Sequence, residues 1–166
     1  MSDSGRNATR VRLPLLDRLL DSGPGGDDRD IGPQMSAEVL RQAVRRDLEA
    51  LLNARRRRLP IPSAYAELPG SPIGYGVPDP TAGSFTDEAR REAMAAEVEA
   101  TIRRFEPRLT SVRVSCAPLP KDQRELIDRT LKLRIDAVLR SDPLPEQISF
   151  ETMVRPLTLD VAVREA

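Results

Sequence analysis

The chain has 166 residues, with 26 basic and 26 acidic side chains, one cysteine, no histidine and no tryptophan. This length suits one domain with its own core. The lack of histidine removes the commonest base at neutral pH, and a single cysteine can form neither an internal disulfide nor a thiolate zinc site. With zero net charge, two tyrosines and three phenylalanines, the chain also lacks the basic surface with stacking aromatics that is typical of nucleic-acid binding.

The first 34 residues are predicted to form a mobile arm in front of a single domain over residues 35–166. Leucines at near-helical spacing predict a short amphipathic helix over residues 13–21. Glycine, proline and aspartate dominate residues 22–34, as in a flexible linker. The N-terminus lacks the apolar stretch of a signal peptide, and no apolar run approaches the roughly 18 residues that cross a bilayer. We therefore expect a cytoplasmic protein with no membrane insertion.

Two amphipathic helices are predicted in the first part of the domain. The first has Ser36 as its N-cap and extends to about Arg58, which places residues 55–58, all arginines, at the negative end of the helix dipole. This arginine run is either a solvated helix end or a site for an acidic partner. The second helix is capped by Ser84 or Thr86 and is stopped by Pro107. Proline and glycine between the helices, over residues 59–83, predict an ordered but irregular loop.

The last third of the chain alternates apolar and polar residues with a period of two, which predicts strands. These strands cover residues 112–116, 131–139, 148–154 and, after Pro156, 157–163. Pro156 favours an edge position for the final ribbon. Helices followed by strands indicate an α+β fold, with N-terminal helices packed on a small C-terminal antiparallel sheet and an exposed C-terminal edge ribbon.

The sequence gives little indication of catalytic activity. Hydrolysis of a sugar bond needs two acids on opposite sides of it. Glu106 lies between a helix and a strand, but no motif places Glu67 or Asp79 beside it. Cys116 is predicted to be a buried strand residue, and phosphate-binding glycine loops are absent. We expect no catalytic residue, no cofactor and no metal, and hence a protein that is not an enzyme.

One charged segment at the end of the second helix stands out. Pro107 fixes the direction of the chain, and Glu106 and Arg108 are expected to project on either side of it as opposite charges. The two charges are either solvated or paired with each other at a helix stop, or they form a pre-ordered ion-pair patch that a partner engages.

Five blocks of the sequence are recognisable when they are taken together and in order. The blocks are Leu-Leu-Asp-Arg-Leu-Leu-Asp (15–21), Arg-Asp-Leu-Glu-Ala-Leu-Leu-Asn (46–53), Tyr-Gly-Val-Pro-Asp (75–79), Phe-Glu-Pro-Arg-Leu (105–109) and Ile-Ser-Phe (148–150). From about residue 13 to its C-terminus the chain resembles the TssE family of type VI secretion baseplate subunits, which is related to the wedge protein of contractile phage tails. The Glu-Pro-Arg and Tyr-Gly-x-Pro-Asp blocks are the most specific, and Val77 replaces a commoner leucine.

The resemblance implies a structural adaptor in a cytoplasmic baseplate wedge. It implies that Glu106, Pro107 and Arg108 contact the helical core bundle of the wedge subunits TssF and TssG, with TssK nearby. It also implies that the C-terminal ribbon exchanges strands with TssB and TssC of the first sheath ring, and an edge strand is a natural template for another chain's strand. The ribbon residues expected to bind the sheath are Leu157, Leu159, Val161 and Val163.

Two expectations about variants follow from the resemblance, and two alternatives stay open. Alanine at Glu106 or Arg108 should leave the fold intact and weaken binding to the wedge. Deletion of the residues after Pro156 should preserve the baseplate and stop sheath extension. The same fold family also includes a small anti-adaptor, a regulatory binding protein, and a glycosidase is the more distant alternative.

Overall fold

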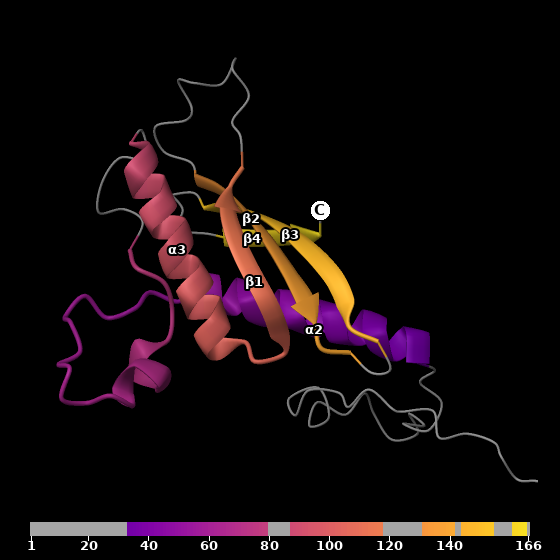
Figure 1. The fold of residues 1–166 in the computed structure, drawn as a ribbon, viewed down its shortest axis with the longest axis horizontal. Coiled ribbons are helices and arrows are strands. Elements are labelled where there is room, and N and C mark those ends of the chain that lie inside the picture. The colour runs from indigo at the N-terminus through magenta and orange to yellow at the C-terminus, as the bar shows by residue number, and fades with distance from the viewer. Residues whose placement is uncertain (1–32, 80–86, 118–130, 142–143, 155–160, 166) are drawn as a thin grey trace, which may run out of the picture.

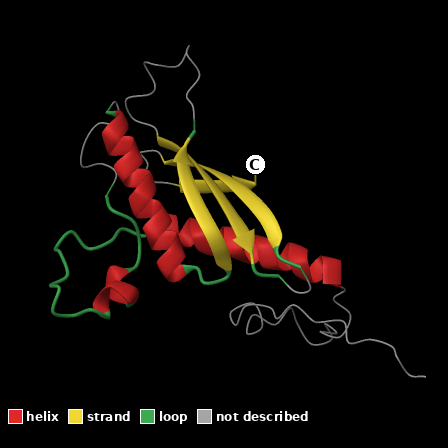
Figure 2. Cartoon of the chain, viewed as in Figure 1, coloured by secondary structure: helices red, strands yellow, loops and turns green. Residues whose placement is uncertain are grey.

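The computed structural model describes residues 33–79, 87–117, 131–141, 144–154 and 161–165. Within these residues, two α-helices are followed by a four-stranded antiparallel sheet, which confirms the predicted α+β class (Figures 1 and 2). The predicted arm over residues 1–34 lies outside the described residues except for its last two, which are helical. The elements are α2 (Pro33–Asn53), the 3-10 turns η1 (Leu68–Gly70) and η2 (Pro72–Gly74), α3 (Glu88–Phe105), β1 (Leu109–Cys116), β2 (Leu131–Leu139), β3 (Glu146–Val154) and β4 (Val161–Glu165).

The sheet has the order β1-β2-β3-β4, and each strand pairs with the next one in the chain. Both helices contribute side chains to the core that covers one face of this sheet, such as Leu48 from α2 and Ile102 from α3. Figure 1 shows α3 alongside β1 and α2 passing behind the strands, and α2 also contacts β4. The opposite face carries the alternating polar side chains, such as the exposed Arg134 and Glu151. The described residues thus form two layers, one of helices and one of strands, and no described helix covers the second face of the sheet.

The helix ends differ from the predicted ones. Ser36 lies inside α2 rather than at its N-cap, and α2 ends at Asn53, so residues 55–58 lie beyond the helix. The prediction of a helix to Arg58 is wrong because the backbone leaves the helix to pair with the loop. The Val77 N–H donates to the Ala54 carbonyl at 3.0 Å, and the Arg56 N–H donates to the Val77 carbonyl at 2.9 Å.

The N-terminus of α3 also has a different cap from the predicted one. Asp87 is the N-cap, and its side chain accepts a hydrogen bond from the Ala89 N–H at 3.1 Å. The prediction of Ser84 or Thr86 as the cap is therefore wrong. Glu88 stands in the first turn of α3, and Arg103 and Arg104 stand in its last turn. Both placements complement the helix dipole.

A β-bulge explains why β1 is longer than predicted. The strand begins at Leu109, and its register against β2 shifts between Thr110 and Arg113. Ser111 in the bulge has a φ of 51°. Leu109 and Val112 are both buried although they are three residues apart, and a strict period of two does not continue across such a bulge. The alternation visible in the sequence therefore begins only after it.

Candidate functional site

The Glu-Pro-Arg segment forms a tight joint between α3 and β1. The Glu106 N–H donates to the Ile102 carbonyl at 2.8 Å, and the Leu109 N–H donates to the Glu106 carbonyl at 3.1 Å. Pro107 is exposed between them, whereas Glu106 is only 4% exposed. The expectation that Glu106 projects from the joint is wrong, because Arg108 folds back over its carboxylate.

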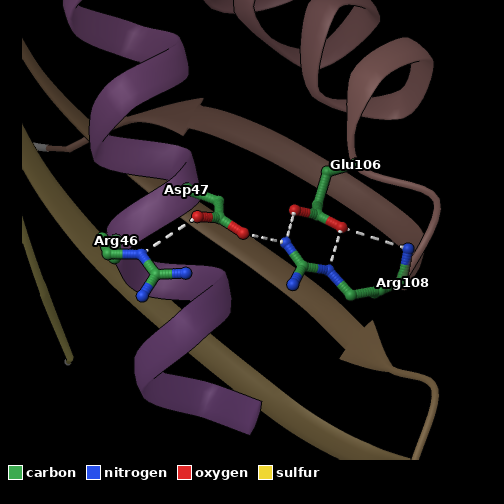
Figure 3. A network of polar contacts seen from close by, with 4 residues as sticks. All are labelled: Arg46, Asp47, Glu106 and Arg108. Carbon is green, nitrogen blue, oxygen red and sulfur yellow. Dashed lines mark hydrogen bonds and ion pairs between the residues drawn. The ribbon is translucent and has the colours of Figure 1, made fainter. Parts of the chain in front are cut away.

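Arg108 is the centre of an ion-pair network (Figure 3). Its Nε donates to Glu106 Oε1 at 2.6 Å, and its Nη2 bonds both Glu106 Oε2 and, at 2.7 Å, Asp47 Oδ2. Its main-chain N–H also donates to Glu106 Oε1 at 3.2 Å. The side-chain hydrogen bonding of Arg108 to the Glu106 carboxylate raises the pKa of Arg108 above its usual value, burial opposes this shift, and Asp47 adds to it. Because Asp47 lies on α2, the network ties the joint to the first helix.

Part of this network reaches the surface. The side chain of Arg108 is 25% exposed and that of Asp47 is 36% exposed. Arg46, which is more exposed still, donates from Nε to Asp47 Oδ1 at 3.2 Å. We call Arg46, Asp47, Pro107 and Arg108 the joint rim. Glu106 and Arg108 are thus paired with each other, as one interpretation of the sequence proposed, and they also hold a set of charged groups in place at the surface.

The Tyr-Gly-Val-Pro-Asp block packs against the same joint. The ring of Tyr75 meets that of Phe105 edge to face, with the centroids 5.3 Å apart and the planes at 74°. Burial, followed by the negative charges of Asp47 and Glu106, raises the pKa of Tyr75 above its usual value. Three blocks that are distant in the sequence therefore meet at the joint.

Gly76 allows this loop to reach the end of α2. Its φ is +100°, a conformation that suits glycine. A Cβ atom at this position would lie 2.5 Å from the carbonyl oxygen of Ala54. The next residue, Val77, is buried and pairs with the backbone on both sides of Arg55. The close approach at Gly76 thus positions Tyr75 beside Phe105.

The final strand, β4, lies at an edge of the sheet, but the side chains expected to bind a partner are not all accessible there. The side chains of Val161 and Val163 are 2% and 1% exposed and belong to the core. Leu157 and Leu159, which were also expected to bind the sheath, lie outside the described residues. Only the main chain of β4 is therefore placed to pair with another strand.

Side chains of α2 cover part of the outer main chain of β4. The Val161 N–H donates to Asn53 Oδ1 at 2.8 Å, and Asn53 Nδ2 donates to the Val161 carbonyl at 2.9 Å. Arg45 Nη1 donates to the Val163 carbonyl at 3.4 Å. The edge strand is thus partly closed in this structure.

The hydrophobic pattern of the sequence does not single out Asp47, Asn53 or Tyr75. All three stand in the blocks that carry the family resemblance, and this was the only available signal. Their contacts join segments far apart in the chain: Asp47 meets Arg108, and Asn53 meets Val161. Helical periodicity assigns such polar residues to a face but names no partner.

The described part of the chain contains neither a metal-binding cluster nor a membrane-spanning helix. Within it, no group of three or more histidine, cysteine, aspartate and glutamate side chains could hold a metal ion. Among the described helices, none has the length and apolar character needed to cross a bilayer. The prediction that Cys116 is buried is only partly right, because the residue lies half-buried against the core at the end of β1, where burial raises the pKa of its thiol.

The joint lies within a region that matches a known protein family. Residues 38–144, which are well over half of the chain, match the family described as baseplate wedge protein gp25. The match includes α3, the joint, β1, β2 and most of α2, and it ends just before β3. The comparisons with curated proteins and with solved structures gave no match. The chain therefore belongs to the baseplate wedge protein gp25 family, which is the family of TssE.

Proposed function

We propose that this protein is a structural subunit of a type VI secretion baseplate, which joins the TssF and TssG wedge to the first TssB and TssC sheath ring and primes sheath polymerisation. The observation that carries the proposal is the family match across the joint. Membership of a wedge-protein family fits a component of a phage-tail-like baseplate. On this proposal the subunit acts on the cytoplasmic side of the envelope, with TssK nearby.

The joint rim is the proposed contact with TssF and TssG. Arg108 is held by Glu106 and Asp47, so little side-chain freedom remains to be lost when a partner binds. Glu106 is buried and therefore acts from inside, by fixing Arg108. Because Glu106 and Arg108 hold each other, alanine at either residue should weaken the fold as well as the contact, which replaces the expectation that the fold stays intact.

The main chain of β4 is the proposed contact with the sheath. An edge strand offers N–H and C=O groups to an added strand, and hydrogen bonds between main chains supply the affinity. Val161 and Val163 serve this contact from the core, by fixing the direction of the strand. Deletion of the residues after Pro156 would remove both core valines, so we now expect it to destabilise the domain rather than to stop sheath extension alone.

A non-enzymatic role fits the geometry of the joint. Glu106 was the strongest candidate for a catalytic acid, but its carboxylate is buried and both of its oxygens accept hydrogen bonds from Arg108. A general acid in a glycosidase must reach the oxygen of the scissile bond. Glu106 has no such access.

The wedge contact is tested by co-purification with TssF and TssG from the same system. We expect the wild-type protein to co-purify with both subunits. Arg46→Glu should lower the apparent affinity about tenfold or more, because it reverses a charge at the joint rim. The matched control is Arg90→Glu, at the opposite end of the 18-residue helix α3, and it should bind like wild type. Failure of the wild-type protein to co-purify would contradict the proposed function. If Arg46→Glu and Arg90→Glu lose the same amount of affinity, the joint rim is not the contact.

A further inference from the structure

One side-chain amide closes the outer edge of β4. Asn53 accepts from the Val161 N–H at 2.8 Å and donates to the Val161 carbonyl at 2.9 Å. In an antiparallel ladder, a hydrogen-bonded pair of residues exchanges two N–H···O bonds in the same way. The amide of Asn53 therefore occupies the place of one residue of a neighbouring strand.

We propose that Asn53 is an internal substitute for a partner strand, which keeps the β4 edge closed in the free subunit and is displaced when an extended strand of a sheath subunit pairs with β4. This inference rests on the proposed function, because the sheath supplies the strand. This inference also specifies the chemical groups that the partner must supply. The partner needs main-chain N–H and C=O groups to bond Val161 and Val163, whose own side chains are buried.

The contacts that close β4 are of a kind that opens easily. Asn53 is exposed at the last position of α2, and its Nδ2 is shared with the Glu49 carbonyl at 2.8 Å. The second contact, from Arg45 to Val163, is long at 3.4 Å, and Arg45 also pairs with Glu49 at 3.6 Å. These bonds are part-buried, but a hydrogen bond between neutral groups contributes only modestly to net stability. The free-energy cost of replacing these bonds with those of an added strand is therefore small.

The opposite edge of the sheet is closed more firmly. The Val114 N–H on β1 donates to the carboxylate of Glu99 at 2.9 Å, and Arg103 donates to the Val112 carbonyl at 2.7 Å. Glu99 and Arg103 are also paired with each other at 2.8 Å. Hydrogen bonds that involve ionised groups are about twice as strong as those between neutral groups. The difference between the two edges directs an added strand to β4 rather than to β1.

The test compares the full-length wild-type protein with Asn53→Ala, using Gln42→Ala as the matched control. Gln42 is exposed on the same helix and bonds Glu38 at 3.1 Å, so its loss removes a surface hydrogen bond without touching β4. Hydrogen exchange of the Val161 amide, followed by NMR without a partner, should become about tenfold faster in Asn53→Ala. Binding to purified TssB and TssC should tighten about threefold to tenfold. Gln42→Ala should match wild type in both measurements.

A second variant keeps the test informative if Asn53→Ala loosens β4. Asn53→Asp retains an acceptor for the Val161 N–H and loses the donor to its carbonyl, so the amide should stay protected while sheath binding tightens less. Unchanged exchange in Asn53→Ala would overturn the inference, and so would faster exchange with equal or weaker sheath binding. If no variant, including wild type, binds TssB and TssC, the proposed link to the sheath is wrong. The exchange of Val161 without a partner still decides separately whether Asn53 closes the edge.

Discussion

Arg108→Ala is expected to lower the free energy of unfolding by about 3 kcal/mol, because it leaves a buried carboxylate without its counter-ion. The side chain of Glu106 is 5% exposed, and Arg108 supplies hydrogen bonds to both of its oxygens. The variant also loses the link from the joint to Asp47 on α2. Urea unfolding followed by circular dichroism measures the change.

The controls separate loss of the ion pair from loss of packing. The double variant Glu106→Gln with Arg108→Ala should be more stable than Arg108→Ala by about 1 kcal/mol or more, because the buried group is then neutral. Asp47→Ala should cost about 1 kcal/mol or less, since its carboxylate is partly exposed. The proposed role of the network fails if Arg108→Ala is as stable as Asp47→Ala, or if the double variant recovers nothing.

Gly76→Ala is expected to lower the free energy of unfolding by about 2 to 3 kcal/mol, because a Cβ atom is strained at positive φ and has no room. The added atom would lie 2.5 Å from the Ala54 carbonyl oxygen. Relief of this overlap would break the bond from the Val77 N–H to Ala54 and the bond from the Arg56 N–H to Val77, and it would move Tyr75 away from Phe105. Thermal unfolding and the fluorescence of the tyrosines report the two effects.

The control for this variant is Gly70→Ala in the same loop. A Cβ atom at Gly70 would have nothing within 4 Å, so this substitution should change the stability by no more than about 0.5 kcal/mol. Equal stability of the two variants would show that the close approach at Gly76 does not hold the loop against α2.

The sequence predicted the sheet best where one face of a strand is buried without interruption. The alternation over residues 131–139 matches β2, whose inward residues are all buried. At β1 the bulge around Ser111 breaks the period, so the first three residues of the strand were missed. An irregular backbone position of this kind leaves no trace in hydrophobic alternation.

Helix ends and charge partners depend on tertiary contacts, and the sequence predicted them less well. The arginine run is typical of a helix end, but hydrogen bonds between Val77 and the backbone of Ala54 and Arg56 take the chain out of the helix after Asn53. The sequence marks the Glu-Pro-Arg segment as a candidate site, but it predicts neither the burial of Glu106 nor the bond from Arg108 to Asp47. Both follow from the packing of α2 beside the joint, which no local pattern encodes.

The proposed link between a baseplate and a sheath can be examined in cells that lack this chain. Fluorescently labelled TssB sheaths are counted in these cells, with and without a plasmid that carries the chain. We predict that these cells form no extended sheaths and that the wild-type chain restores them. Sheaths of normal number and length in cells without the chain would contradict the proposed link.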